Sequence, residues 1–294
     1  MGVLRQFTSW FSGRRVDLDQ RFEVLREAIH GTMSQFYKAR DRKTNAIVGL
    51  KVLDIEKTAK FEERFAKLNK PSEGEIATSL HHPAIAETWE YGTTTKGQPF
   101  LVMEFFEGTV LSTLIHTHSE LLQGNRLSLL RQAAEATAAV HRAGYIHRDI
   151  CPRNFVVAPD GQSLKLIDFG LTVPDTPPFR QPGNRTGTPR YMAPEVVRRR
   201  PTDRRLDIFA FGVTAYELFA GQSPWPRQET TGRVAMDHDK PPVPITQHCP
   251  DIDPRLAEAI HCCLQSDPAQ RPSSLEQFLD MIRDVPAGQD TAPA

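Results

Sequence analysis

The stretch that decides the fold reads His147-Arg148-Asp149-Ile150-Cys151-Pro152-Arg153-Asn154, and Asp168-Phe169-Gly170 follows it further along the chain. It supplies two carboxylates, Asp149 and Asp168, and one amide, Asn154. Such a set suits the in-line transfer of a phosphoryl group from ATP, because one carboxylate can orient the attacking hydroxyl while the other oxygens hold metal ions. We therefore predict Asp149 as the catalytic residue. Asn154 and Asp168 are the predicted ligands of Mg²⁺, with Mn²⁺ as the alternative.

Three segments outside this stretch extend the pattern. Ile47–Lys51 is an apolar run that ends in a lysine, Phe100–Gly108 is a second apolar run, and Thr186–Glu195 reads T-G-T-P-R-Y-M-A-P-E. With the two motifs above, they make the chain, from about Arg21 to about Ile282, resemble the protein kinase superfamily of the Ser/Thr type, in particular the bacterial eukaryotic-like kinases. The resemblance implies ATP, Mg²⁺ and a protein substrate with a serine or threonine acceptor.

The residue pattern and the resemblance together predict an α+β, two-lobed fold. Alternating apolar runs between Phe22 and Val52, and again at 86–91 and 99–103, are typical of strands. Residues 57–80 are predicted to be mostly helical. We therefore expect a small antiparallel β lobe with one main helix, and a larger lobe that is mainly helical.

The larger lobe is predicted from longer periodic runs. Leu127–Ala143 and Asp207–Ala220 carry apolar residues at the spacing of core helices. Apolar residues at similar spacing predict a short helix within the first 19 residues. The predicted divisions are an N-terminal extension (1–19), an N-lobe (20–104), a C-lobe (105–283) and a flexible tail (284–294).

Composition limits the functional classes. The 36 basic and 36 acidic residues give a net charge of zero, which argues against a nucleic-acid partner. The four cysteines form no C-x-x-C pair, so we expect neither a disulfide framework nor a zinc site, and a reducing, cytoplasmic location. The sequence shows no signal peptide and no run of about 18 apolar residues, so no transmembrane segment is expected. It leaves the oligomeric state open.

The resemblance assigns the nucleotide-binding residues. Lys51 stands where the family lysine contacts the α- and β-phosphates and pairs with a glutamate of the small-lobe helix. Glu73 is the predicted partner and Glu75 the alternative, because Pro and Gly within residues 71–74 can shift the helical register. Gly49 stands where the family has an alanine against adenine, so we expect a looser pocket. The other predicted nucleotide contacts are Met103 as gatekeeper, backbone groups of Glu104 and Phe106, and Val156.

The glycine-rich loop that covers the phosphates in the family is degenerate here. Its three glycine positions align with Ile29, Gly31 and Ser34, so only the central glycine remains. Glycine lets the backbone adopt positive φ and approach phosphate oxygens, and the β-branched Ile29 resists such a conformation. We expect weaker ATP binding, or a loop of altered shape.

The catalytic loop departs from the Ser/Thr pattern at one position. Cys151 replaces the lysine that steadies the transferred phosphate in the family, and a thiol supplies no positive charge. We predict that Arg153 compensates as a catalytic residue, because tyrosine kinases also lack this lysine and carry an arginine at about this place. A redox switch at Cys151 is the alternative to a tolerated substitution.

Regulation and acceptor choice are predicted from the loop that follows. Arg148 suggests control by loop phosphorylation, because a phosphate can pair with its guanidinium. Thr186 is the predicted phosphorylation site and Thr176 the alternative. The Gly-Thr-Pro element around Thr188 favours serine and threonine acceptors, and Thr188 is expected to contact Asp149.

Three more residues are predicted to hold the fold together. Asp207 is expected to anchor the backbone of the catalytic loop. Glu195 and Arg271 are expected to form a buried ion pair, and the loss of one partner from such a pair costs about 3–5 kcal/mol.

Three functions remain open at this point. The favoured one is an active Ser/Thr protein kinase, which is able to autophosphorylate. The second is a pseudokinase or scaffold module with weak nucleotide binding, supported by Ile29, Ser34 and Cys151. The third is a kinase-like enzyme acting on a small molecule, against which the segment Thr186–Glu195 argues.

Overall fold

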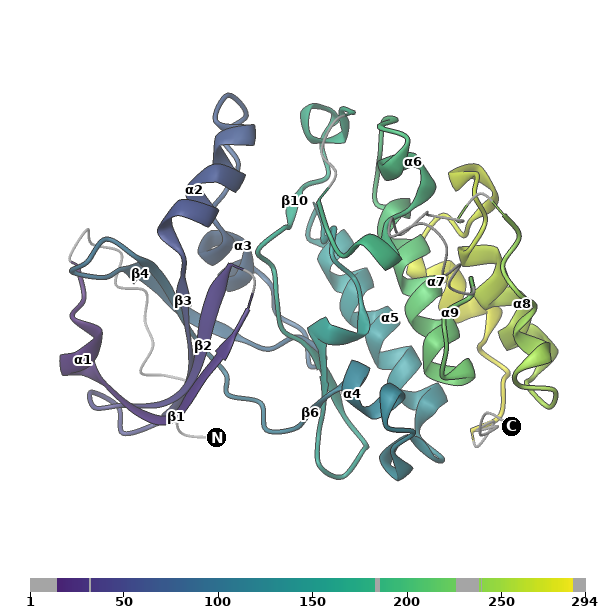
Figure 1. Ribbon diagram of the computed structural model, residues 1–294, viewed down its shortest axis with the longest axis horizontal. Coiled ribbons are helices and arrows are strands. Elements are labelled where there is room, and N and C mark those ends of the chain that lie inside the picture. The colour runs from purple at the N-terminus through teal and green to yellow at the C-terminus, as the bar shows by residue number, and fades with distance from the viewer. Residues whose placement is uncertain (1–14, 32, 183–185, 226–237, 239, 288–294) are drawn as a thin grey trace, which may run out of the picture. The chain divides into compact units, whose positions relative to one another are not determined.

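The computed structural model describes residues 15–31, 33–182, 186–225, 238 and 240–287, with the backbone alone for residues 27–30. Two compact units divide between Phe106 and Glu107 (Figure 1). Within the described ranges, no helix is both long enough and apolar enough to cross a lipid bilayer. The short helix predicted near the N-terminus falls on residues 1–14, outside the described ranges.

Unit 1 is built on a five-stranded antiparallel sheet in the order β1-β2-β3-β5-β4 (Figure 1). Its sequence is rich in β-branched and aromatic residues, which favour strands. The strands are β1 (Phe22–His30), β2 (Ser34–Asp41), β3 (Ile47–Leu53), β4 (Thr88–Thr93) and β5 (Pro99–Met103).

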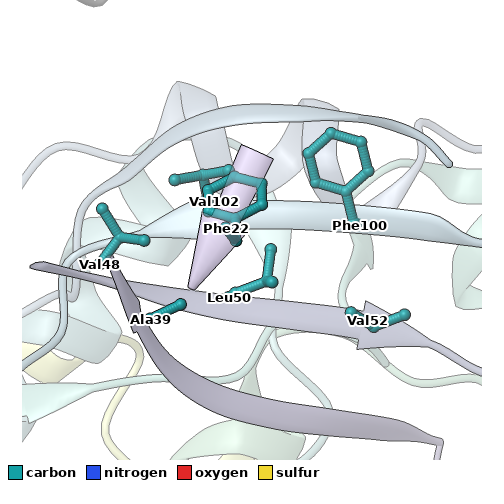
Figure 2. Close-up of a cluster of buried hydrophobic side chains, with 7 residues drawn as sticks. All are labelled: Phe22, Ala39, Val48, Leu50, Val52, Phe100 and Val102. Atoms are coloured by element: carbon teal, nitrogen blue, oxygen red, sulfur yellow. The ribbon is translucent and has the colours of Figure 1, made fainter. Parts of the chain in front are cut away.

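The sheet has two faces, because successive residues of a strand point to opposite sides. Figure 2 shows the core cluster of one face, which consists of Phe22, Ala39, Val48, Leu50, Val52, Phe100 and Val102. Gly49 and Lys51 alternate with these β3 residues and therefore belong to the other face. In the antiparallel register their partners on β2 are Lys38 and Phe36. We call this second side the Lys51 face.

The helical region of unit 1 consists of several short helices, whereas the sequence predicted one main helix. Ser72 begins the last piece through a capping box: its hydroxyl accepts from the Glu75 amide at 3.2 Å, and the Glu75 carboxylate accepts from the Ser72 amide at 2.7 Å. The preceding Pro71 does not fit a helix interior, which explains the break. The pieces are α2 (Ile55–Glu62), η1 (Glu63–Phe65) and α3 (Glu73–Ser79), and a separate short helix, α1 (Leu18–Arg21), precedes the sheet.

Unit 2 is mainly helical. Its α-helices are α4 (Leu111–His116), α5 (Arg126–Arg142), α6 (Pro194–Val197), α7 (Arg205–Ala220), α8 (Pro254–Cys263) and α9 (Leu275–Met281). Every residue of α7 from Leu206 to Ala220 is buried, whereas the sequence predicted one apolar stripe. The reason is that α5 and α8 both pack against α7.

Short strands and 3-10 turns position the polar loops of unit 2. Strand β7 ends just before His147, β9 ends just before the Asp168 motif, and the turn η3 lies between Asp149 and β8. One small sheet has the order β6-β8-β9, and β7 pairs with β10. The strands are β6 (Thr109–Val110), β7 (Tyr145–Ile146), β8 (Phe155–Val157), β9 (Leu164–Leu166) and β10 (Val173–Pro174). The 3-10 turns are η2 (Glu120–Leu122), η3 (Pro152–Asn154), η4 (Pro177–Arg180), η5 (Pro189–Tyr191), η6 (Ile245–Gln247) and η7 (Pro268–Gln270).

Candidate functional site

A buried ion pair marks the Lys51 face of unit 1. Lys51 comes from β3 and Glu73 from the first turn of α3, and both residues are less than a tenth exposed. The Lys51 ammonium donates to the Glu73 carboxylate at 2.5 Å. The structure therefore brings together the lysine and the first of its two predicted partners. Glu75, the alternative, is used in the capping box with Ser72.

The position of Glu73 depends on close packing of α3 against β4. Gly74 lies within the helix and does not interrupt it. A Cβ at Gly74 would lie 2.4 Å from Cγ of Tyr91 on β4, a contact too short for any side chain. The missing side chain therefore lets α3 approach the sheet closely enough for Glu73 to reach Lys51.

The loop between β1 and β2 is a tight hairpin. Ile29 pairs with Phe36 in the strand ladder, so its backbone is extended. The Gly31 amide donates to the carbonyl of Ser34 at 2.8 Å, which closes the turn. The amide of the one remaining glycine is therefore already used within the hairpin, in contrast to a loop whose amides all face a phosphate.

The space beside Gly49 is filled, although the sequence predicted a looser pocket there. A Cβ on Gly49 would lie 2.7 Å from Cζ of Phe36 and 2.9 Å from its Cε2. The Phe36 ring thus occupies the space in which an alanine methyl would lie. Sequence reasoning missed Phe36, because the contact depends on the register of two strands.

The other predicted base contacts of unit 1 lie at the end of β5. Met103 is buried and pairs with Gly49 in the ladder. The Glu104 amide donates to the Glu87 carbonyl at 2.8 Å, while Phe106 is half-buried. Val156, the predicted contact from unit 2, is buried in β8 and pairs with Val110.

Asp149 is the centre of the polar cluster of unit 2. Its Oδ1 accepts two hydrogen bonds from Thr188, at 2.7 Å from the backbone amide and 2.8 Å from the hydroxyl. Its Oδ2 accepts from the side-chain amide of Asn154 at 3.1 Å, and the same Asn154 nitrogen donates to the Asp149 carbonyl at 2.7 Å. Both carboxylate oxygens are therefore oriented by neighbours.

The Thr188 hydroxyl also connects Asp149 to Arg153. The exposed Arg153 guanidinium donates to this hydroxyl at 2.8 Å. Cys151 is fully buried, with its sulfur 3.8 Å from the same hydroxyl, and burial raises the pKa of its thiol to about 11. The thiol is therefore protonated at neutral pH and shielded from solvent, which opposes the redox alternative.

Asp168 and Asn154 have the donor chemistry that Mg²⁺ requires. Asp168 Oδ1 accepts from the Gly170 amide at 2.9 Å, which fixes the carboxylate after β9. The nitrogen of the Asn154 side chain is directed at Asp149, which leaves its oxygen as the ligand atom. The described part of the chain contains no group of three His, Cys, Asp or Glu side chains arranged around a metal. Mg²⁺ fits nevertheless, because it usually binds one or two carboxylates, substrate phosphates and water.

Asp207 anchors the catalytic loop from the buried helix α7. Its two carboxylate oxygens accept from the backbone amides of His147 at 2.7 Å and Arg148 at 2.8 Å, and His141 contacts it at 2.9 Å. Burial alone would raise the pKa of Asp207, but the bond to His141 and the charge and backbone bond of His147 lower it. Sequence reasoning missed His141, because no motif spacing connects it to Asp207.

Arg148 and Thr186 line one small pocket beside Asp149. Arg148 is buried, which lowers the pKa of its guanidinium. Among the described residues, its Nη1 atom and the Thr186 hydroxyl are both buried without a hydrogen-bond partner. Thr176, the alternative phosphorylation site, is exposed at the start of η4.

Glu195 and Arg271 form a two-point ion pair in the interior of unit 2. Arg271 donates through both terminal nitrogens to the two Glu195 oxygens, each at 2.8 Å. Neither side chain is more than 5% exposed. The guanidinium also lies over the Phe209 ring, 4.9 Å from its centroid.

A cluster next to Thr188 was missed by sequence reasoning. The Tyr191 hydroxyl donates to the Glu217 carboxylate at 2.6 Å, and Arg190 donates to the other oxygen at 3.2 Å. Burial raises the pKa of Glu217, although the hydrogen bond from Tyr191 and the charge of Arg190 act to lower it. Tyr191 lies in the T-G-T-P-R-Y run, but its partner is more than twenty positions away on an apolar helix and stands out only in the structure.

Comparison with known proteins gives consistent matches over most of the chain. A family model described as "Protein kinase domain" matches residues 22–281. The serine/threonine-protein kinase PknA of Mycobacterium tuberculosis is 33% identical over 93% of this chain and 63% of its own length. The serine/threonine-protein kinase pkn3 of Myxococcus xanthus is 31% identical, over 92% of this chain and 50% of its own length.

A third relative extends the range of similarity. The serine/threonine-protein kinase PknB of Mycolicibacterium smegmatis is 29% identical over 90% of this chain and 43% of its own length. The chain thus spans between about two fifths and two thirds of the length of these relatives.

Proposed function

The chain belongs to the protein kinase family, and from this premise we propose that it transfers the γ-phosphoryl group of ATP to serine or threonine hydroxyls of proteins, its own included. The observation that carries the proposal is the setting of Asp149, whose two carboxylate oxygens are held by Thr188 and Asn154. The relatives are named serine/threonine-protein kinases, which supports this choice of acceptor.

Asp149 orients the acceptor hydroxyl and takes its proton. Its carboxylate is only half-buried and keeps one lone-pair direction on Oδ2, because the two bonds from Thr188 use both directions of Oδ1. Proton transfer by a carboxylate requires hydrogen-bond reach and a fixed orientation, and the two neighbours provide the orientation.

Arg153 supplies the positive charge that Cys151 cannot. Its guanidinium donates to the Thr188 hydroxyl, which in turn donates to Asp149, so only one hydroxyl separates the cation from the catalytic carboxylate. Arg153 is exposed, and arginine donates through a planar fork that suits phosphate oxygens. We assign it the stabilisation of the transferred phosphoryl group.

Each unit carries groups of its own for the ligands of the reaction. Lys51, fixed by Glu73, contacts phosphate oxygens, while backbone groups of Glu104 and Phe106 bind the base edge. Mg²⁺, or Mn²⁺ with the same type of oxygen ligand, is held by Asn154 and Asp168 in unit 2. When bound, the metal ion neutralises the charge that develops on the phosphates.

Phosphorylation of the loop before Thr188 is the proposed control. Arg148 keeps a buried, unpartnered nitrogen in the pocket that Thr186 also lines, so a phosphate on Thr186 would find a cation there. The Thr186 hydroxyl is buried, however, and the loop must open before it can be modified. Exposed Thr176 is accessible without such opening and is the alternative site. Thr186→Ala is expected to lower activity; unchanged activity and a loop without phosphate would contradict this assignment.

The rival function is a nucleotide-binding scaffold without catalysis. The observation that favours it is the closed β1–β2 hairpin, in which the Gly31 amide is bound to Ser34 and not available to a phosphate. The same residues would then bind ATP weakly and transfer nothing.

The deciding experiment measures phosphate incorporation from labelled Mg-ATP into the chain itself and into a generic basic protein. Wild type is compared with Asp149→Asn and with Asp251→Asn, which removes an exposed carboxylate of the same unit. Label on serine or threonine that survives in Asp251→Asn and disappears in Asp149→Asn supports the kinase. No label from folded wild-type protein would favour the scaffold.

A further inference from the structure

An excess of positive charge marks residues 188–205. Over the whole chain the charges balance, with 36 basic and 36 acidic residues, but this segment holds six arginines and only two acidic residues. Both of its carboxylates are already paired, Glu195 with Arg271 and Asp203 with Arg205. The positive charge of the other arginines is therefore not cancelled by acidic side chains of the same segment.

Arg190 is the arginine of this segment that lies nearest to Thr188 along the chain. It belongs to the turn η5, two residues after Thr188, and a 3-10 turn rises about 2 Å per residue. One of its terminal nitrogens donates to Oε1 of Glu217 at 3.2 Å, while the side chain stays 45% exposed. Oε2 of Glu217 accepts from the Tyr191 hydroxyl, so the carboxylate is itself fixed through both oxygens. Arg190 is thus held in place on one side and exposed on the other.

The pairing with Glu217 decides which sign of charge a ligand can carry here. A cationic side chain would find the buried Glu217 carboxylate already occupied by Arg190 and Tyr191. It would also meet the Arg190 guanidinium, and like charges repel. An anionic side chain meets an exposed guanidinium whose partner carboxylate is buried, and the planar fork of arginine suits carboxylate oxygens.

A second exposed guanidinium adjoins the same loop. Arg153 donates to the Thr188 hydroxyl, which in turn donates to Asp149. An acceptor hydroxyl at Asp149 is therefore close to two arginines, Arg153 through one hydroxyl and Arg190 two residues beyond Thr188. Three more exposed arginines, 198–200, follow α6 directly. Charges that make no direct contact still attract an opposite charge within the Debye length, about 8 Å at physiological salt.

We propose that the acceptor is an acidic peptide, in which the carboxylate of an aspartate or glutamate near the acceptor hydroxyl binds Arg190. This inference rests on the proposed function, because it names the substrate class of the same site. An extended peptide advances about 3.3 Å per residue, so a carboxylate within about three residues of the acceptor comes within reach of Arg190. A generic basic protein should accordingly be a poor acceptor.

The test compares acceptor peptides that differ in charge alone. Each peptide has one serine in a neutral background, and the three positions on either side of the serine are all Asp, all Asn or all Lys. We expect kcat/KM for the Asp peptide to exceed that for the Asn peptide about tenfold, mainly through a lower KM, because hydrogen bonds between charged groups are stronger than neutral ones. The ratio should shrink as salt is added, and the Lys peptide should be the poorest acceptor.

Substitutions at Arg190 assign the preference to this residue. Arg190→Gln should lower the Asp/Asn ratio of kcat/KM to about twofold or less, whereas Arg190→Lys, which keeps the charge, should retain most of it. Arg190→Gln/Glu217→Gln removes the buried carboxylate that the single variant leaves unpaired, and it should show the same low ratio. Arg142→Gln is the matched control, because Arg142 is also an exposed arginine of unit 2 that pairs with one glutamate. It should keep the wild-type ratio, and the fold of every variant is checked by thermal melting.

A binding measurement separates recognition of the peptide from catalysis. The Asp and Asn peptides are labelled with a fluorophore, carry alanine in place of the serine, and are titrated with protein while the fluorescence anisotropy is followed. The Asp peptide should bind wild type about tenfold more tightly than the Asn peptide, and Arg190→Gln should remove most of this difference. An RNA oligonucleotide of the same net charge should not displace the Asp peptide.

The outcomes distinguish this inference from the proposed function. In a wild type that labels itself, equal kcat/KM for the Asp and Asn peptides would overturn the inference, as would a preference for the Lys peptide or displacement by RNA. A preference that persists in both variants carrying Arg190→Gln would overturn the assignment to Arg190. A folded wild type that binds the Asp peptide but labels neither itself nor any peptide would count against the proposed function and support the acidic ligand. A folded wild type that binds no peptide and labels nothing would overturn both.

Discussion

Replacing Arg271 by alanine tests the interior of unit 2. The Arg271 side chain is completely buried and donates to Glu195 through two terminal nitrogens. It also donates to three backbone carbonyls, those of Gln265 at 2.8 Å, Arg205 at 2.9 Å and Ser266 at 3.2 Å. The substitution therefore leaves a buried carboxylate and three acceptors without their partner.

The expected loss of stability follows from these contacts. Removing one partner of a buried ion pair costs about 3–5 kcal/mol, because the remaining charge is left unpaired in the interior. The three carbonyls are only partly buried, so the loss of each hydrogen bond adds at most about 0.5–1.5 kcal/mol, and less where water replaces the donor. We expect a loss of at least about 4 kcal/mol, which is a large share of the 5–15 kcal/mol typical of a folded domain.

The matched control is an arginine of the same unit whose ion pair has a similar nitrogen–oxygen distance but is exposed. Arg142 donates to Glu276 at 2.7 Å, but the two side chains are 55% and 47% exposed. Exposed pairs contribute at most about 1 kcal/mol. Arg142→Ala should therefore cost less than about 1 kcal/mol, although the nitrogen–oxygen distance is nearly that of the buried pair.

The assay is urea unfolding followed by circular dichroism, with the free energy taken from linear extrapolation to water. A Glu195→Gln/Arg271→Met variant completes the comparison, since replacing both charges removes the unpaired one and should cost less than Arg271→Ala alone. The reasoning is refuted if Arg271→Ala is no less stable than Arg142→Ala.

Three further predictions concern the catalytic loop and the segment next to Thr188. Burial lowers the pKa of His147, so below about pH 6.5 the unfolded chain gains a proton that the folded chain does not, and the free energy of unfolding should fall on acidification. In unfolding curves at pH 5–6.5, His147→Phe should reduce the change in this free energy by up to about 1.4 kcal/mol per pH unit. An unchanged pH dependence would contradict the prediction. Cys151, whose thiol pKa is raised to about 11, should react with iodoacetamide at pH 8 far more slowly than the partly exposed Cys262, as followed by mass spectrometry; equal rates would show that Cys151 is accessible. Gly187→Ala should destabilise the chain by about 1–3 kcal/mol or more, because Gly187 has φ +114° and its Cβ would lie 2.6 Å from a backbone carbonyl oxygen; a variant that melts like wild type would exclude the strain.

Sequence reasoning identified those site residues whose position depends on chain order and element type. Asp149 and Asn154 are five residues apart on either side of a turn, so their contact is local. Lys51 and its partner Glu73, with Glu75 as the alternative, were predicted from the family resemblance and not from spacing alone. The two-lobed α+β fold followed from the same patterns, and the family match confirms it.

Sequence reasoning missed the contacts that depend on the register of paired strands or on the packing of several elements around one helix. The Phe36 ring reaches Gly49 only because β2 and β3 pair in one register, and a shift by one residue would place it on the core face. His141 reaches Asp207 because α5 packs on α7, which no spacing in the chain indicates. The complete burial of α7 likewise depends on neighbours that are distant in sequence.

Two of the departures from the family pattern, at Gly49 and Cys151, have a common physical form. At Gly49 a methyl group is missing, and Phe36 from the neighbouring strand fills the space. At Cys151 a cation is missing, and Arg153 binds the hydroxyl that the missing lysine would adjoin. A chain that had merely lost its activity would have no reason to match each loss with a neighbour of the right size or charge. The two pairs therefore support a retained active site, and they predict that restoring one family residue alone impairs the site until its partner is changed as well.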